Sequence, residues 1–319
     1  GAKAFGWDAG PRKARQRREG EWWIGTGMAS GARIHNAMES KARVTLHADG
    51  TALVETDMTD IGTGTYTILA QMVAEMLGLD HEKVTVELGD SRHPRGPGSG
   101  GSWGAASIGS AAYLACEAIR KDLAKRAKVA DDALELRDGK VGGDRTLVDL
   151  LDGKSLSHEG HFKPGKEQEK YTAAGFGAFF AQVRVNHFTG ETRVDRMLGA
   201  FGFGRVLNQR TARSQCLGGL TWSIGTALTE ALEFDPRDGH LVNRDLAEYH
   251  VPVHRDVPDL DVLLIEERDA IASPIEAKGI GELGMCGGAA AIGNTIYNAC
   301  GARVLQFPIT PDSVLENLP

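Results

Sequence analysis

The sequence predicts an α+β protein of two similar lobes, in each of which helices cover an antiparallel sheet. A unit made of a strand hairpin, a glycine-bearing loop, a helix and a further strand occurs twice along the chain. Each unit can bury one face of its sheet only under its own helix, so two units predict two layered lobes. A polar, glycine-rich stretch at residues 130–170 separates the units. We therefore expect a first lobe at 1–170 and a second lobe at 171–319.

Local signals mark each element of the first unit. Alternation of apolar and polar residues is typical of strands, and Asp49-Gly50 favours a tight hairpin turn. Gly78 suits the left-handed backbone that ends many helices. The elements expected from these signals are strands at 42–47 and 52–56, a helix at 66–77 and a strand at 84–88.

The second unit follows the same order. A turn at Thr189-Gly190 separates two alternating segments, and a loop through Gly202, Gly204 and Asn208 leads into a long helical segment. The elements expected here are strands at 182–185 and 192–195, a helix at 211–231 and a strand at 231–234. Two further helices are expected at 105–126 and 287–301.

Composition excludes several classes of protein. The net charge of −7 argues against a nucleic-acid surface, which needs a basic stripe. No apolar run approaches the roughly 20 residues of a membrane span, and no signal peptide is visible. We therefore expect a cytoplasmic location, with the periplasm as the alternative. The four cysteines are isolated from one another, which disfavours an iron–sulfur cluster or a structural zinc site.

Four glycine-bearing loops each precede a predicted helix. A helix N-terminus offers unpaired N–H groups and the positive end of a dipole, and glycine lets a phosphate approach these groups closely. Several such loops together can hold a large anionic cofactor, although a single one is more often only a turn. The loops lie at 62–65, at 98–104, before 215–219 and at 278–284.

A dinucleotide fold is the obvious rival. Gly279, Gly281 and Gly284 match the Gly-x-Gly-x-x-Gly spacing of such folds, but Pro274 interrupts the segment before them. The acidic residue expected about 20 residues later is missing, and only 35 residues follow Gly284. We therefore expect neither NAD nor FAD on this chain.

The histidines supply no recognisable metal motif. His250 and His254 are four residues apart, but Pro252 between them disfavours a shared helical face. No Ser-His-Asp triad with a nucleophile elbow is visible. A metal in this protein is therefore expected to arrive with its own ligands.

At the four glycine loops the sequence resembles the molybdopterin-binding subunits of xanthine dehydrogenases and aldehyde oxidases, in their second, C-terminal molybdopterin-binding domain. The resemblance runs from residues 4–7 to 308–311. Its most specific part is Lys278-Gly279-Ile280-Gly281-Glu282, followed by the segment 289–296. It implies a molybdenum–pterin cofactor, either molybdopterin or its cytosine dinucleotide form, with the metal held by the pterin. It implies no iron–sulfur cluster on this chain.

The resemblance also implies roles for single residues. In the family, the glutamate of the motif is the catalytic base and its lysine contacts the cofactor, and Gln215 matches a glutamine that reaches the cofactor. From the pentapeptide alone, Glu282 could equally be a surface glutamate in a flexible turn. The cofactor-binding residues implied by the resemblance are Gly62, Thr63, Gly64, Gly100, Gly101, Ser102, Gly104, Gln215 and Lys278.

The sequence departs from the family pattern in three places. Thr63 stands where many relatives carry glutamine, and Ser214 replaces a glycine before Gln215. Leu283-Gly284 replaces a Glu-Pro-Pro type continuation after the motif. The family's first molybdenum domain and its iron–sulfur and flavin modules have no counterpart here, and the abrupt start of the chain suits a fragment or a split gene product.

The resemblance implies a molybdenum hydroxylase that oxidatively hydroxylates an aldehyde or an N-heterocycle, with Glu282 taking the proton from a molybdenum-bound hydroxyl. We expect the chain to be inactive without its partners, which are the N-terminal half of the molybdenum domain and the iron–sulfur and FAD subunits or domains. The alternative is a non-catalytic assembly module that supplies half of the cofactor site to a partner subunit. The loops at 60–65 and 98–104 resemble bacterial aldehyde-oxidising members more than purine-oxidising ones.

Overall fold

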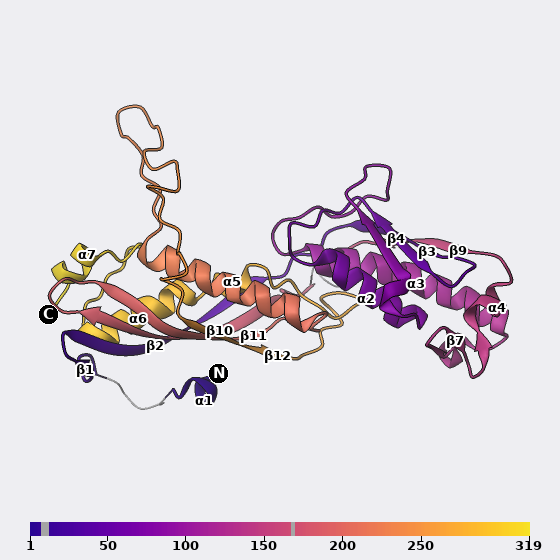
Figure 1. Ribbon diagram of the computed structural model, residues 1–319, viewed down its shortest axis with the longest axis horizontal. Coiled ribbons are helices and arrows are strands. Elements are labelled where there is room, and N and C mark those ends of the chain that lie inside the picture. The colour runs from indigo at the N-terminus through magenta and orange to yellow at the C-terminus, as the bar shows by residue number, and fades with distance from the viewer. Residues whose placement is uncertain (8–12, 167–169) are drawn as a thin grey trace.

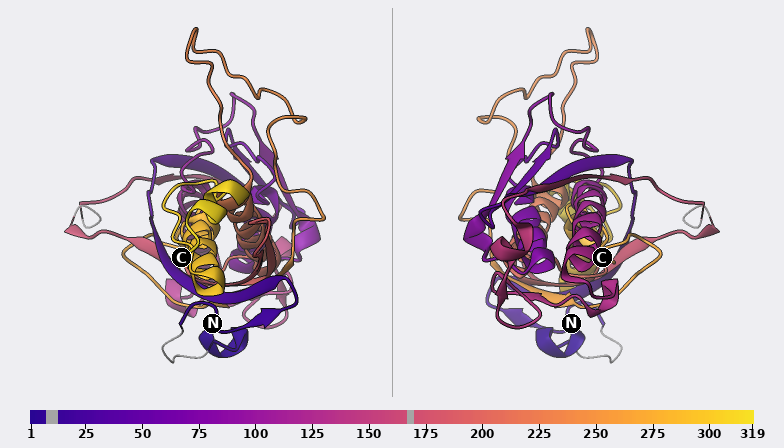
Figure 2. Two further views of the ribbon diagram at one scale, coloured as in Figure 1. Left: turned by 90° about the vertical axis from the view of Figure 1, so that its left-hand side faces the viewer. Right: turned by 90° about the vertical axis from the view of Figure 1, so that its right-hand side faces the viewer.

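The computed structural model describes residues 1–7, 13–166 and 170–319. Two α+β lobes lie one after the other along its longest axis (Figure 1). Viewed along that axis, the helices run through the middle and strands pass around them (Figure 2). No helix in the described ranges has the length and apolar character that crossing a membrane requires. The predicted fold class, two α+β lobes with helix-covered sheets, is confirmed.

The first lobe is built on a four-stranded sheet in the order β5-β4-β3-β9. Inward residues of the sheet, such as Val44 and Val54, share one core with Leu69 and Ile119 from the two covering helices. Burial of each large apolar side chain stabilises the lobe by about 1.5–3 kcal/mol. The main elements are β3 (Ser40–Leu46), β4 (Ala52–Thr56), α2 (Thr65–Leu77), β5 (Val84–Leu88), α3 (Gly104–Ala127) and β9 (Leu156–Phe162).

The second lobe has a five-stranded sheet in the order β1-β2-β10-β11-β12. Its core joins Phe179 and Phe201 from the sheet with Leu220 and Ile296 from the two covering helices. Its main elements are β1 (Arg18–Glu19), β2 (Trp22–Ile34), β10 (Ala174–Asn186), β11 (Thr192–Gly202), α5 (Gln209–Leu228), β12 (Asp259–Ile265) and α6 (Gly288–Cys300).

Glycines let a helix lie directly on a strand in both lobes. A Cβ at Gly160 in β9 would stand 2.6 Å from the backbone nitrogen of Ala115 in α3. A Cβ at Gly27 in β2 would stand 2.6 Å from the backbone nitrogen of Thr295 in α6. Side chains at these positions would push helix and sheet apart. The same device therefore brings the helix close to the sheet in each lobe.

The predicted repeat is present in three dimensions, with two corrections. In each lobe a hairpin is followed by a helix and by a strand parallel to the second hairpin strand, because the helix crosses over between them. Each sheet is therefore mixed rather than wholly antiparallel. The strand expected at 231–234 is wrong, since Phe234 makes only an isolated bridge with Leu241. The closing strand is β12.

The expected first lobe at 1–170 is wrong at its N-terminal end. Strand β2 pairs antiparallel with β10 along its whole length, from Trp22 with Asn186 to Ile34 with Ala174. Strands β1 and β2 therefore belong to the second-lobe sheet, and the chain enters the first-lobe sheet only at β3. The register with β10 fixes this arrangement, and nothing local in the sequence encodes it.

The stretch at 130–170, expected as a polar separator, closes the first lobe instead. It supplies strand β9 and a small three-stranded sheet. The elements that complete the described chain are α1 (Ala2–Phe5), η1 (His81–Lys83), η2 (Asp131–Ala133), β6 (Leu136–Arg137), β7 (Lys140–Val141), β8 (Arg145–Thr146), α4 (Leu147–Leu151), η4 (Leu283–Met285) and α7 (Pro311–Glu316).

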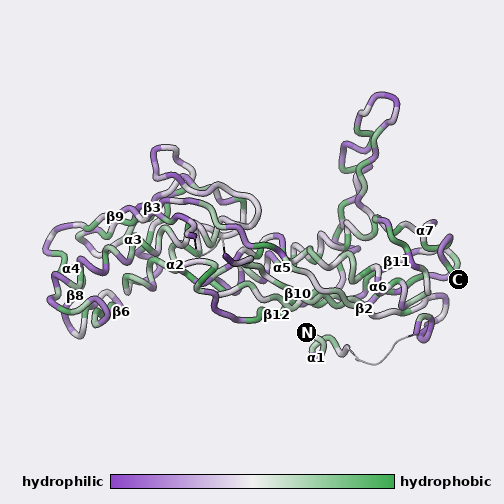
Figure 3. Tube along the Cα trace, turned by 180° about the vertical axis from the view of Figure 1, so that it is seen from behind, coloured by the Kyte–Doolittle hydropathy of each residue, from purple (hydrophilic) through white to green (hydrophobic). Residues whose placement is uncertain are grey.

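Between α5 and β12 the chain leaves the body as a long arm, which both end views show projecting to one side (Figure 2). The tip of this arm is hydrophilic (Figure 3). The Asn243 amide donates to the Ala231 carbonyl at 2.6 Å, and the Tyr249 hydroxyl donates to Glu230 at 2.8 Å. These contacts tie the two sides of the arm together near its base.

Candidate cofactor site

A cavity of about 350 Å³ lies where the two lobes meet. This volume falls within the range of about 300–1,000 Å³ that small-molecule sites show. The first lobe contributes the loops before α2 and α3, and the second lobe contributes the start of α5 and the motif loop. Eight of the ten predicted site residues line the cavity: Thr63, Gly100, Gly101, Ser102, Gly104, Gln215, Lys278 and Glu282.

The other two predicted residues, Gly62 and Gly64, lie in the loop before α2 but do not line the cavity. Both have positive φ angles, of 96° and 91°. A Cβ at Gly64 would stand 2.7 Å from the Thr211 side chain, so this glycine lets the loop before α2 pack on the start of α5.

Asp60, which the sequence analysis missed, holds this loop. Its Oδ1 accepts hydrogen bonds from the N–H groups of Gly62 at 2.8 Å and Gly64 at 3.3 Å. Burial raises the pKa of Asp60, but backbone hydrogen bonds from Gly62, Tyr66 and Gly64 outweigh burial and leave the pKa below its usual value. The carboxylate therefore stays ionised and fixes the backbone ahead of α2.

The loop before α3 interlocks with the motif loop across the lobe boundary. Gly101 and Ser102 both have left-handed backbone, with φ of 44° and 59°. Such a conformation is uncommon for serine and is often found at functional sites. A Cβ at Gly279 would stand 2.8 Å from the Cβ of Ser102 and would also meet the Ser102 carbonyl oxygen. Only glycine leaves room for this crossing.

Glu282 is held from two sides at the cavity. Its backbone N–H donates to the Ser102 hydroxyl at 2.9 Å, and that hydroxyl lies 3.3 Å from Oε2 of the Glu282 side chain. Arg33 donates to the same oxygen through Nε at 2.8 Å and Nη2 at 2.5 Å. Within the described ranges, no hydrogen bond reaches Oε1 of Glu282. One carboxylate oxygen, Oε2, is thus held by Arg33 and Ser102.

Arg33 is the residue that the sequence analysis most clearly missed. It lies near the end of β2 and stands 249 residues before Glu282 in the sequence. No local motif surrounds it. Only the pairing of β2 with β10 brings its guanidinium to the motif loop, so no signal in the sequence could have located it.

Lys278 lines the cavity, but its ammonium group is already paired. Nζ lies 2.7 Å from Glu267 and 3.2 Å from Asp269, and only 6% of the side chain is exposed. Its backbone N–H donates to the Phe203 carbonyl at 2.8 Å. In this arrangement Lys278 anchors the start of the motif loop. A direct contact between its ammonium and a cofactor stays a prediction.

His35, directly after β2, supports the next residue of the motif. Its Nδ1 accepts a hydrogen bond from the Gly279 N–H at 3.2 Å. Burial lowers the pKa of His35, and the Lys278 ammonium nearby lowers it further. The ring therefore stays neutral, as an acceptor at Nδ1 requires. The sequence analysis missed this residue as well.

Comparison with known proteins places the chain in a family. The chain matches the molybdopterin cofactor-binding domain over residues 1–258. The chain belongs to this family. The resemblance to the xanthine dehydrogenase/aldehyde oxidase molybdenum-binding subunits, predicted from the glycine loops, is confirmed, although the match ends before the Lys278–Glu282 motif.

Curated relatives of this molybdopterin-binding chain are oxidoreductases. It is 47% identical over its whole length to the aldehyde oxidoreductase molybdenum-binding subunit PaoC of Escherichia coli K12, of which it covers 44%. It is 32% identical to the probable hypoxanthine oxidase XdhD of the same strain, over 94% of this chain and 33% of that protein. The chain spans less than half the length of these relatives.

A solved structure shows the same fold. The aldehyde oxidoreductase of Desulfovibrio gigas superposes with a TM-score of 0.77 and 28% identity, over 96% of this chain and 33% of that one. The cavity in our chain suits the cofactor of the family in two respects. Glycine backbone at the start of α3 brings N–H groups to the cavity, where they can face an anion, and Thr63, Ser102 and Gln215 add neutral polar groups.

Proposed function

We propose that this chain forms the molybdenum-cofactor half of the active site of an oxidoreductase that hydroxylates an aldehyde or an N-heterocycle, with Glu282 as the general base. The observation that carries this proposal is the asymmetric setting of the Glu282 carboxylate at the cavity. Oε2 is fixed by Arg33 and Ser102, and Oε1 is left to accept a proton. A general base needs this fixed geometry within reach of the reacting group.

The cofactor would rest on the residues that line the cavity. Thr63 and the Gly100–Gly104 backbone would face it from the first lobe, with Gln215 and the motif loop on the other side. When bound, a molybdenum–pterin group, as molybdopterin or its cytosine dinucleotide, supplies the two-electron redox chemistry that no side chain provides. Glu282 would remove the proton at Oε1. Arg33 and Ser102 would keep the carboxylate from rotating away.

The proposal includes partners. Electrons must leave the site, and within the described ranges the cysteines are free and separate, so iron–sulfur and FAD subunits or domains would carry the electrons. The remaining half of the molybdenum domain would complete the substrate pocket. We place the assembly in the cytoplasm, with the periplasm as the alternative.

Reconstitution tests this function. We expect no substrate-dependent dye reduction from the 319-residue chain alone, and turnover of an aldehyde or N-heterocycle once the missing half and the redox partners are added. Dye reduction by the purified chain alone would contradict the proposed dependence on partners. An assembled, molybdenum-loaded complex that oxidises neither class of substrate would contradict the proposed reaction.

A non-catalytic assembly module, which supplies half of the cofactor site to a partner subunit, is the second candidate. Analysis of molybdenum and pterin in the purified chain separates the two. Stoichiometric cofactor favours the catalytic half-site. A purified chain that folds and pairs with its partner but holds no molybdenum or pterin by itself favours the module.

A further inference from the structure

A cluster of ionisable side chains lies on the first-lobe sheet, on the face away from α2 and α3. Glu55 in β4 and Glu87 in β5 are register partners in a parallel strand pair, so their carboxylates stand side by side. Like charges placed opposite each other destabilise a sheet unless something compensates them. Glu55 is only 16% exposed, which leaves little water to screen the repulsion.

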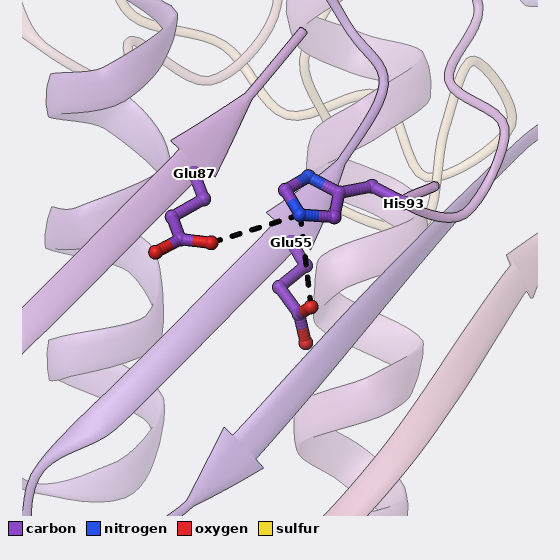
Figure 4. Close-up of side chains that lie close together, drawn as sticks. All are labelled: Glu55, Glu87 and His93. Atoms are coloured by element: carbon purple, nitrogen blue, oxygen red, sulfur yellow. Dashed lines mark ion pairs between the residues drawn. The ribbon is translucent and has the colours of Figure 1, made fainter. Parts of the chain in front are cut away.

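His93 fills the space between the two carboxylates. It lies in the loop after β5, and its imidazole points between the two glutamates (Figure 4). Nε2 lies 3.8 Å from Glu55 Oε1 and 3.6 Å from Glu87 Oε2. Only 11% of the His93 side chain is exposed. The ring is therefore buried against the pair rather than loosely laid over it.

These distances are too long for hydrogen bonds, which span about 2.7–3.2 Å. They are close to the spacing of atoms that share a metal. Bonds of about 2.0–2.2 Å in tetrahedral geometry place neighbouring ligand atoms roughly 3.4 Å apart. One ligand atom from each of the three residues lies within 4.8 Å of the others.

The other nitrogen of the His93 ring, Nδ1, faces away from the two carboxylates' contacts with Nε2. It is buried and also has no hydrogen-bond partner among the described residues. A buried ring nitrogen without a partner, such as Nδ1, is rare in proteins, and Nε2 lies beyond hydrogen-bond distance of both carboxylates. A ligand at Nε2 would satisfy the nitrogen that faces the carboxylates.

We propose that Glu55, Glu87 and His93 bind a divalent transition-metal ion of the zinc type, with water at the open position. The imidazole favours zinc over calcium or magnesium, which prefer oxygen ligands alone. Arg43 lies 3.5 Å from Glu55 Oε1 on the side of β3 and holds that carboxylate in place. The sequence analysis found no metal motif here because the three ligands come from two strands and a loop.

The ion would fasten the His93 loop to the sheet. Just after His93, the Pro94 and Arg95 carbonyls accept hydrogen bonds from the N–H groups of Asp57 at 2.9 Å and Lys41 at 2.8 Å. The chain then runs on into the glycine loop that lines the cavity. A bound ion would therefore hold the chain in place just before the glycine loop that precedes α3. Whether an ion binds there does not depend on the reaction proposed above.

Zinc titration of the full 319-residue chain, stripped of metal beforehand, tests this site. We expect one tight ion per chain by calorimetry, and an X-ray absorption spectrum with one nitrogen and two carboxylate ligands from the protein and no sulfur. His93→Gln and Glu87→Gln should each weaken binding beyond the roughly 10- to 100-fold cost of losing an outer-shell partner. Glu87 is 54% exposed, so its variant is expected to fold even if the histidine variant does not.

His161→Gln is the matched control. His161 lies in the same lobe and pairs with a single carboxylate, Glu39, at 2.6 Å. Its replacement should leave zinc affinity unchanged. Wild-type chain that binds no zinc, Glu87→Gln chain that binds it as tightly as wild type, or a spectrum with sulfur ligands would each overturn the proposal.

Discussion

Replacement of the motif glutamate, Glu282→Gln, gives the sharpest test of the proposed mechanism. The glutamine carbonyl can take the place of Oε2 and accept hydrogen bonds from Arg33 and Ser102. The amide NH₂ then occupies the position of Oε1, where it can donate a hydrogen bond but cannot accept a proton. Packing and cofactor retention are expected to survive, because the side chain keeps its size and its fixed end.

The magnitude follows from the loss of a positioned base. Such a base contributes about 10²- to 10⁴-fold in rate, which corresponds to roughly 2.7–5.4 kcal/mol at 1.36 kcal/mol per tenfold. The loss should lower kcat more than it raises KM. The interaction between Glu282 and the proton becomes strong only in the transition state. The assay is steady-state substrate oxidation by the assembled enzyme with a dye acceptor, with rates normalised to molybdenum content.

Glu276→Gln provides a matched control. Glu276 also pairs with an arginine, Arg268, at 2.8 Å, and it does not line the cavity. The Glu276→Gln variant should have a kcat close to that of the wild type. If Glu282→Gln keeps most of the wild-type kcat at full molybdenum occupancy, Glu282 is not the base and the likeness at the motif is one of fold only.

Three further predictions follow from the same geometry. Arg33→Lys keeps the charge but loses the two-nitrogen grip on Oε2, and the misplaced carboxylate should lower kcat about 10- to 100-fold at unchanged cofactor content. Gly279→Ala should reduce the pterin content and lower the midpoint of thermal unfolding, because the new Cβ would clash with Ser102. A pterin content equal to that of the wild type would show that cofactor binding does not need the close approach of the motif loop to the loop before α3. Burial raises the pKa of Asp269, but hydrogen bonds from Ala272 and Lys278 outweigh burial and leave its pKa below the usual value. The ionised carboxylate of Asp269 therefore stabilises the fold above the unfolded-state pKa, and this stabilisation is lost as the pH falls through the folded-state pKa. The stability of the Asp269→Asn variant should therefore fall less steeply at low pH than that of the wild type, as measured by acid unfolding with circular dichroism. An acid profile identical to that of the wild type would contradict the stabilising role of ionised Asp269.

A repeated architecture underlies the site. Both lobes use a hairpin, a crossover helix and a parallel strand, and both lay a second helix on a glycine-bearing strand. In each lobe, most of the segments that line the cavity come just before or at the start of a helix. The two lobes therefore present their helix starts to a shared boundary, and the cavity forms there.

The sequence by itself determined the elements whose signals are local. The hairpin turn at Asp49-Gly50 and the helix ended by Gly78 lie where turn chemistry and periodicity predicted them. The four glycine-bearing loops, of which the motif around Glu282 is the most specific, together predicted the family, because each is contiguous in the chain. Eight of ten predicted site residues line one cavity, and most of them lie in short loops with their own patterns, whereas Gln215 lies inside α5.

Which distant segments meet depends on the three-dimensional packing of the sheets. Strand β2 belongs to the second lobe because its 13 residues pair in register with β10, and such a choice of partner has no local signature. That pairing brings Arg33 to Glu282, and the pairing of β4 with β5 brings Glu55 to Glu87. Long stretches of chain separate the side chains that meet across such pairings. The local sequence pattern does not determine the paths of those stretches, so the contacts are fixed only when the whole sheet packs.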